Sequence, residues 1–202
     1  MGQTKVNKKI AIYGGAFSPP HIGHAITMEN IIRLFPCDEI WVMPSADRLD
    51  KKIGVNRNHR LKMLDLFLRD FFPRPKVIIQ ISRVELDRPK LTTTYETKIE
   101  LEKQYPNYEF YFIIGADILG DIKQKWVRGK KLFDTANFIV IKRPCVAMPR
   151  SLPSKLTILD ENVIKDDTSS TFVRKLLSQG FSGMPYITNK IANYIKNNQL
   201  YQ

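Results

Sequence analysis

The sequence predicts an α/β protein in which a doubly wound parallel sheet of five to six strands carries helices on both faces. Short apolar, β-prone runs alternate along the chain with longer segments of helical periodicity, and this alternation is typical of parallel sheets. With 202 residues, 43% of them hydrophobic, the chain is long enough to bury a sheet between two helical layers. Since no repeat or long linker divides it, we predict one domain over residues 1–202, with a helical C-terminal portion at about 168–202.

The strands are predicted from apolar runs that end in glycine, proline or polar residues. The first run, 10–13, ends in two glycines. Residues 108–114 are nearly all apolar or aromatic, which favours a central place in the sheet. The other predicted strands are 38–44, 77–81, 137–141 and a short sixth run at 156–159.

The helices are predicted from apolar residues at intervals of three and four. The first helix begins near His21, and a basic helical region runs from 118 to 133. Residues 167–171 open a helix that ends at Gly180 and Gly183. Further helices are predicted over 60–71, 94–104 and 188–198. In parallel sheets ligands bind where the strands end, and the residues there are Gly14, Gly15, Pro44, Ser82, 115–117 and Arg143.

The first strand leads into the most informative stretch of the chain. Gly14 and Gly15 permit a sharp turn and close approach of a ligand to the backbone, and Pro19 and Pro20 stiffen the loop before the next helix. Free N–H groups at the start of that helix favour an anion there. His21 and His24, three residues apart on one helical face, can donate ring N–H groups to phosphate oxygens, and Gly23 leaves the approach open.

Two simpler interpretations apply to this stretch. It can be a tight strand-to-helix turn with two ordinary histidines. The HxxH pair can also suggest zinc, but neither Cys37 nor Cys145 supplies a metal-type spacing, so we predict no protein-bound metal.

A second anion site is predicted at residues 166–171. The run Asp-Asp-Thr-Ser-Ser-Thr before an apolar-periodic segment indicates a helix N-cap, and capping alone would explain it. Arg174 and Lys175 follow within one turn, so hydroxyl groups, free N–H groups and cations gather at one end. We therefore expect the helix starts at His21 and Ser169 to converge on opposite ends of one polyphosphate.

Composition restricts the class of protein further. The net charge of +12 favours anionic partners without choosing among nucleotides, nucleic acids and membrane surfaces. Two distant cysteines suit a reducing compartment, and no apolar run reaches transmembrane length, so we expect a cytoplasmic protein without a membrane partner. The basic residues are spread along the chain rather than interleaved with aromatics, which argues against a nucleic-acid-binding module.

These motifs resemble those of the bacterial nicotinate-nucleotide adenylyltransferases, members of the Rossmann-like nucleotidyltransferases with an HxGH motif. Residues 14–24 are similar to the family's GG-T-F-D-P-x-H-x-G-H, and 168–174 to its I-S-S-T-x-I-R. Residues 114–117 with Trp126 resemble I-G-A-D…W. Ser18 departs from the usual aspartate, Thr93 from a tyrosine, and 48–51 from P-P-H-K.

The resemblance implies transfer of AMP from ATP to nicotinate mononucleotide, giving deamido-NAD and pyrophosphate, with Mg²⁺ carried by ATP and pyrophosphate. The implied catalytic residues are His21, His24, Lys51 and Arg174. The implied ATP contacts are Gly14, Gly15, Phe17, Ser18, Gly23, Gly115, Asp117, Ser169, Ser170 and Thr171. The implied acceptor contacts are Thr94, Trp126, as a stacking platform for the pyridine ring, and Arg143.

Several alternatives stay open at this point. The acceptor can be nicotinamide mononucleotide or phosphopantetheine instead, and the chain can be a homo-oligomer. His21-Ile22-Gly23-His24 also occurs in class I tRNA synthetases, but 202 residues cannot hold such an enzyme and no K-M-S-K-S sequence is present. Trp41 is expected in the core, and His59 is expected to be a solvated residue at a helix start.

Overall fold

The computed structural model describes residues 8–46, 55–88, 93–142 and 148–202. Its six strands form one parallel sheet in the order β3-β2-β1-β4-β5-β6, which confirms the predicted fold class. The strands are β1 (Lys8–Gly15), β2 (Glu39–Pro44), β3 (Ile78–Ile81), β4 (Tyr108–Gly115), β5 (Asn137–Ile141) and β6 (Leu156–Leu159).

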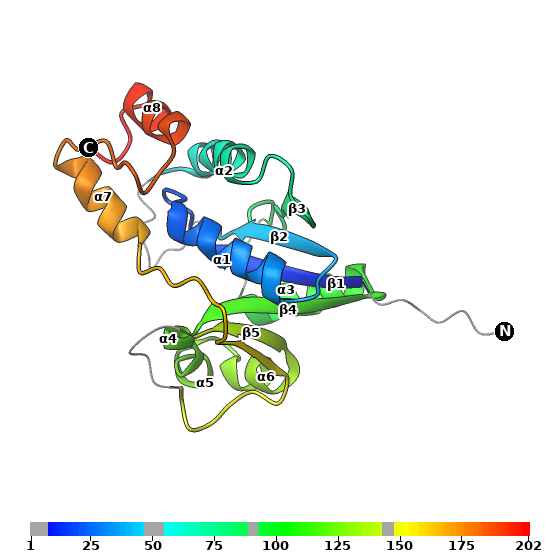
Figure 1. Ribbon diagram of the computed structural model, residues 1–202. Helices are drawn as coiled ribbons and strands as arrows, with labels where there is room; N and C mark the ends of the chain where they lie inside the picture. The colour runs from blue at the N-terminus through cyan, green and yellow to red at the C-terminus, as the bar shows by residue number, and fades with distance from the viewer. Residues whose placement is uncertain (1–7, 47–54, 89–92, 143–147) are drawn as a thin grey trace.

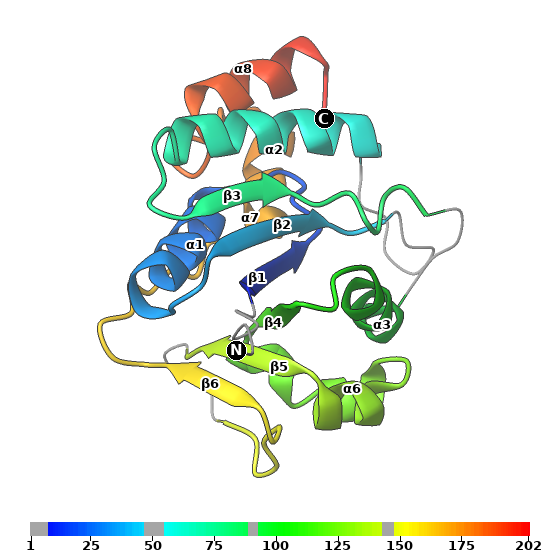
Figure 2. The ribbon, with the colours of Figure 1, turned by 90° about the vertical axis from the view of Figure 1, so that its right-hand side faces the viewer.

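The strand order reverses between β1 and β4, at the centre of the sheet. From β1 the chain winds outward through β2 to β3, then returns to β4 beside β1 and winds outward on the other side (Figures 1 and 2). Such a reversal leaves a crevice at the carboxyl ends of the two central strands, because their connections leave in opposite directions. Gly14 and Gly15 at the end of β1, and Gly115 at the end of β4, lie at this crevice.

Helices cover both faces because side chains alternate along each strand. Ala11 of β1 packs with the helices on one face, whereas Ile10 and Ile12 face the other. The first face carries α1 (Ile22–Leu34), α2 (Arg57–Phe71), α7 (Ser170–Ser178) and α8 (Asn189–Asn197). The second carries α3 (Thr94–Gln104), α4 (Ala116–Leu119), α5 (Ile122–Lys125) and α6 (Gly129–Thr135).

The region after β4 differs from the single basic helix that periodicity predicts. It is divided into three short helices, α4, α5 and α6. Gly120 ends the first, and Arg128 adopts a left-handed backbone conformation with φ of 54° before the last. A side chain at Gly129 would lie 1.8 Å from the Ile122 carbonyl oxygen, so the segment must turn sharply to pack here.

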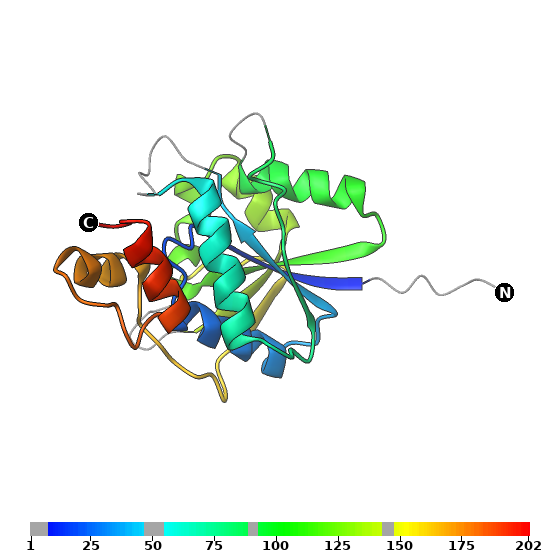
Figure 3. The same cartoon turned by 90° about the horizontal axis from the view of Figure 1, so that it is seen from above.

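Other element boundaries differ by a few residues. Helix α2 begins at Arg57 rather than Arg60, because the Asn56 side chain accepts hydrogen bonds from the N–H groups of Asn58 and His59. Strand β3 lies at the sheet edge, and its Ile78 is 59% exposed. Helices α7 and α8 pack beside the carboxyl end of β1, and seen from above α8 lies next to α2 (Figure 3).

Candidate active site

The turn after β1 forms the floor of the site, and a buried arginine holds it. Arg60 of α2 is fully buried, and its Nη1 donates hydrogen bonds to the carbonyl oxygens of Ala16 (3.2 Å) and Ser45 (2.8 Å). These two carbonyls follow β1 and β2 respectively, so one guanidinium ties the ends of two neighbouring strands to α2.

The buried Phe17 ring packs beneath the His24 side chain and the end of β1. Its ring is 1% exposed and contacts Tyr13 and His24, with ring centroids 5.5 Å and 4.9 Å away. Its backbone has φ of 48°, a conformation that non-glycine residues adopt only where the surroundings enforce it. Because the side chain is enclosed, any contact between this residue and a nucleotide involves its backbone.

The two histidines lie against each other at the start of α1. Their ring centroids are 3.8 Å apart, and the His21 backbone N–H donates to His24 Nδ1 at 3.1 Å. Since Nδ1 accepts this bond, the neutral His24 ring carries its proton on Nε2. Burial, assisted by neighbouring His21, holds the pKa of His24 well below its usual value. His24 is therefore a neutral hydrogen-bond donor at neutral pH.

The first N–H of α1 is not free, contrary to the expectation of an open helix start. Ile22 donates its N–H to the carbonyl oxygen of Tyr186, at 2.7 Å. Tyr186 belongs to the segment between α7 and α8, so the C-terminal part of the chain already satisfies this donor. The anion-binding capacity of this turn accordingly depends more on the histidine rings than the sequence suggested.

Helix α7 begins at the second predicted phosphate site, and its cap is made as expected. The Ser169 side chain accepts a hydrogen bond from the Phe172 N–H at 3.2 Å. Asp166 accepts two hydrogen bonds from Thr168, one from its N–H (2.8 Å) and one from its hydroxyl (3.0 Å). The side chains of Ser169 and Thr171 are exposed at this helix start.

The starts of α1 and α7 meet, as the sequence predicts. The Ser170 hydroxyl donates to the Pro19 carbonyl (2.9 Å), and Arg174 Nη1 donates to the Ser18 carbonyl (2.8 Å). Arg174 Nη2 also donates to the Thr171 hydroxyl at 3.0 Å. Ser170 and Arg174 therefore join the two turns to each other, a structural task that the motif alone did not assign to them.

Two further contacts bring α7 to this place. Asn30 of α1 is 1% exposed, and its amide pairs with the Ile164 backbone through bonds of 2.8 Å and 2.9 Å. Gly23 lies so close to the segment before α7 that an added Cβ would stand 2.4 Å from Asp166 Oδ1 and 3.1 Å from the Thr168 carbonyl oxygen. The absence of a side chain at Gly23 thus serves helix packing.

Two of the predicted acceptor residues, Thr94 and Trp126, lie around the starts of α3 and α6. Thr94 opens α3, whose capping box is formed by Thr93 and Glu96. Half-buried Trp126 ends α5, and the Arg128 guanidinium that follows lies 5.7 Å from the Tyr95 ring centroid. The structure therefore brings the α3 start next to the α5–α6 turn.

The rest of the predicted residues divide into two groups. Gly115 ends β4, and Asp117 lies exposed in the first turn of α4, both at the carboxyl edge of the sheet. Gly14 is exposed at the same edge. Lys51 and Arg143 lie outside the described residues.

Sequence reasoning assigned no role to three residues that shape the site: Tyr186, Tyr201 and Arg60, the last of which it noted only as fitting a motif of the family. Arg60 could have been found, because it shares the apolar face of its helix with Leu64 and Phe67. The tyrosines gave no local signal. His59 corrects another prediction, since its Nδ1 is hydrogen-bonded to the Tyr194 hydroxyl at 2.8 Å rather than solvated.

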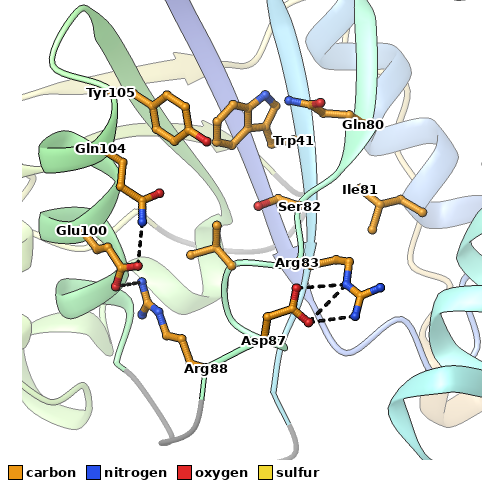
Figure 4. A pocket seen from close by; sticks show the side chains of 11 residues that line it. Trp41, Gln80, Ile81, Ser82, Arg83, Asp87, Arg88, Glu100, Gln104 and Tyr105 are labelled. Atoms are coloured by element: carbon orange, nitrogen blue, oxygen red, sulfur yellow. Dashed lines mark hydrogen bonds and ion pairs between the residues drawn. The ribbon is translucent and has the colours of Figure 1, made fainter.

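A cavity of about 440 Å³ lies elsewhere, between β2, the turn after β3 and the C-terminal half of α3 (Figure 4). Trp41, 5% exposed and in the core as predicted, forms one wall with Tyr105. The charged side chains at this cavity pair with each other, Arg83 with Asp87 and Arg88 with Glu100. It opens on the α3 face of the sheet, away from the histidines.

Neither a protein-held metal nor a membrane span is found in the described part of the chain. Within it, no three or more His, Cys, Asp and Glu side chains are grouped so that they could hold a metal ion. Within the same residues, no helix has the length and apolar character needed to cross a membrane.

Comparison with known proteins agrees with this geometry. Residues 12–176 match the family model described as cytidylyltransferase-like. The chain is 32% identical over 98% of its length to a probable nicotinate-nucleotide adenylyltransferase of Streptococcus pneumoniae, covering 91% of that protein. It is 31% identical over 96% of its length to the nicotinate-nucleotide adenylyltransferase of Bacillus subtilis, covering 99% of it.

A solved structure gives the same result. The chain superposes on the Plasmodium falciparum nicotinic acid mononucleotide adenylyltransferase complexed with NaAD with a TM-score of 0.81 and 28% identity, covering 96% of this chain and 98% of that one. With the parallel sheet and the paired histidines at its centre, these matches show that the chain belongs to the nicotinate-nucleotide adenylyltransferases, within the cytidylyltransferase-like family.

Proposed function

We propose that the protein transfers AMP from ATP to nicotinate mononucleotide, releasing pyrophosphate and forming deamido-NAD, a step of NAD biosynthesis. The observation that carries this proposal is the meeting of the α1 and α7 starts, where the histidine pair and Arg174 gather at the carboxyl end of β1. The family membership supports the same reaction.

In the proposed reaction the chain positions two substrates and stabilises charge. The phosphate oxygen of the mononucleotide attacks the α-phosphorus of ATP in line, the bond from that phosphorus to the bridging oxygen breaks, and pyrophosphate leaves. His24 donates its Nε2 proton as a hydrogen bond to the α-phosphate oxygens, where negative charge accumulates in the transition state. Because its ring is neutral, it donates without needing to be protonated.

The two turns divide the triphosphate between them in this proposal. His21 and Gly23 face its α-phosphate, while Ser169, Thr171 and Arg174 at the start of α7 face the β- and γ-phosphates. Gly115 and Asp117 lie beside the adenosine, and Thr94 and Trp126 beside the pyridine ring. Lys51 and Arg143 keep their predicted roles toward the phosphates and the acceptor.

Mg²⁺ enters this proposal as part of the substrate. The ion is bound by ATP and leaves with pyrophosphate, which requires no cluster of protein ligands. We place the reaction in the cytoplasm, which is in keeping with two cysteines far apart in a basic chain.

The test is a pyrophosphate-release assay with MgATP and a panel of three acceptors: nicotinate mononucleotide, nicotinamide mononucleotide and phosphopantetheine. We expect release with the first, and turnover lower by about two to three orders of magnitude in His24→Ala, since a transition-state donor is lost. Release with phosphopantetheine alone would reassign the acceptor. No release with any of them, together with salt-dependent oligonucleotide binding, would contradict the enzymatic proposal.

A further inference from the structure

The end of the described chain reaches back into the turn after β1. The hydroxyl groups of Tyr201 and Ser18 are hydrogen-bonded at 2.9 Å, although 183 positions separate them in the sequence. Burial raises the pKa of Tyr201 to about 12, partly offset by its bond to Ser18 and by Arg174 and Arg60. The phenol is thus a neutral, largely enclosed group throughout the physiological pH range.

Ser18 is the residue of this turn that is hydrogen-bonded both to α7 and to the C-terminal segment. The residue is 1% exposed; Arg174 binds its carbonyl oxygen and Tyr201 binds its hydroxyl. It follows Phe17, whose positive φ needs its surroundings to hold it. Ser18 therefore connects the C-terminal segment with the backbone that leads directly to His21.

From this arrangement we propose that Tyr201 is a positioning residue for ATP binding, acting through the Ser18 hydroxyl to hold the turn 16–19 and the histidines after it. This inference rests on the proposed function in one respect, because it takes the triphosphate to lie against this turn. Tyr201 acts through Ser18 and needs no contact with either substrate.

A second tyrosine of the same segment offers a matched control. The Tyr194 hydroxyl is bonded to His59 Nδ1 at 2.8 Å, a bond of similar length that joins α8 to α2. Tyr194→Phe and Tyr201→Phe each remove one hydroxyl and keep the ring. Only the second removes a bond to the turn.

The first measurement is steady-state kinetics of the full-length variants with both substrates varied. In Tyr201→Phe we expect the KM for ATP to rise about three- to tenfold, the range for losing one hydrogen bond, with the KM for the mononucleotide unchanged. In Tyr194→Phe both constants should stay at the wild-type values. An unchanged KM for ATP in Tyr201→Phe, or equal changes in both variants, would overturn the inference.

A double-mutant cycle then tests whether Tyr201 acts through Ser18. In a Ser18→Ala background, Tyr201→Phe should change the KM for ATP by less than about twofold, because the bond is already gone. Independent, additive effects of the two substitutions would refute coupling through this bond.

Calorimetric binding of the non-hydrolysable analogue α,β-methylene ATP separates this inference from the reaction itself. Its Kd should rise by the same factor in Tyr201→Phe and stay unchanged in Tyr194→Phe. If the wild-type protein released no pyrophosphate, the proposed function would fail, while this comparison would still decide the role of Tyr201.

Discussion

The charge state of the His24 imidazole decides which hydrogen bonds this side chain can donate. It lies partly buried among the rings of Tyr13, Phe17, Phe67 and His21, and loss of hydration together with the neighbouring His21 disfavours a positive charge. In addition, its Nδ1 is committed to the His21 N–H, so only Nε2 is available as a donor. Sequence alone suggested two equivalent donors, whereas in the structure the His21 backbone fixes which nitrogen of His24 can donate.

The low pKa of His24 predicts how stability depends on pH. The unfolded chain takes up a proton near pH 6.5, whereas the folded chain does so only at lower pH. Between these values the unfolded state binds more protons, so the free energy of unfolding should fall as pH decreases below about 6.5 and stay level above about 7.5. Urea denaturation from pH 5.5 to 8.5 measures this.

His24→Gln is the reference for that measurement, because it keeps a polar side chain that does not titrate. The difference in unfolding free energy between wild type and His24→Gln should carry the slope below pH 6.5. A difference that is independent of pH would mean that His24 is not held neutral by the fold.

Trp126 supplies the second prediction at this scale. The residue is half-buried at the α5–α6 turn, which lies next to the start of α3 through the contact of Arg128 with Tyr95. Trp126→Ala should raise the KM for the mononucleotide about three- to tenfold and leave that for ATP nearly unchanged, because only the pyridine ring loses its partner. The control is Trp41→Phe, a core change that should alter neither KM; an effect of Trp126→Ala on ATP alone would contradict stacking.

At the scale of elements, α2 is organised by an arginine on its buried face. Arg60 lies among the core residues Met63, Leu64 and Phe67 and replaces the hydrophobic contact of that position with hydrogen bonds to two carbonyls. These carbonyls begin the turns after β1 and β2. The helix thus fixes the geometry of the strand ends as well as covering the sheet.

We expect Arg60→Met to lower the free energy of unfolding by about 2–4 kcal/mol, because the carbonyl oxygens of Ala16 and Ser45 lose their buried, charged donor. Arg69→Met on the same helix is the control: Arg69 is exposed and pairs with Asp65 at the surface, so its loss should cost within about 0.5 kcal/mol. Urea midpoints at an unchanged m-value compare the two. Equal losses would show that the burial of Arg60 is without energetic consequence.

At the scale of the whole molecule, the site joins two distant parts of the chain. The Asn30 side-chain amide is hydrogen-bonded to both the N–H and the carbonyl oxygen of Ile164. The Ser170 hydroxyl donates to the Pro19 carbonyl oxygen, and Gly23 packs against Asp166. The C-terminal helices lie beside the carboxyl end of β1, completing its surroundings (Figure 1). The geometry of the site therefore depends on correct docking of the C-terminal segment of the chain.

Gly23→Ala tests that docking. The added Cβ would stand 2.4 Å from Asp166 Oδ1 and 3.1 Å from the Thr168 carbonyl oxygen, so either the Asp166 carboxylate gives up its hydrogen bonds to Thr168 or α1 moves away from this segment. We expect a loss of about 1–3 kcal/mol in unfolding free energy, together with a fall in turnover. Thermal unfolding and the pyrophosphate assay measure the two effects.

Gly14→Ala is the matched control for that change. Apart from its two neighbours in the chain, no described residue has an atom within 4 Å of an added Cβ there, and the space faces the crevice. Stability should be unchanged or slightly higher, since glycine is replaced within a strand, while turnover falls because the methyl group projects toward the nucleotide. Wild-type stability in Gly23→Ala would show that the two turns do not press on each other.

Local patterns along the chain were enough to place the strands, most of the helices and the two turns that meet at the site. These features leave marks within a few residues: apolar runs, residues at helical spacing, capping side chains, and glycines beside histidines. For this reason the alternation of elements predicted the parallel sheet, and the runs 14–24 and 166–174 indicated where an anion would bind.

Which groups those turns leave available could be learned only from the folded chain. The Ile22 N–H is taken by Tyr186, the Ser18 hydroxyl by Tyr201, and the guanidiniums of Arg60 and Arg174 by carbonyls of the turn after β1. Such partners are distant in sequence and follow no period, so no local pattern announces them. They are selected because buried polar groups must find hydrogen bonds, and folding alone brings those partners within reach.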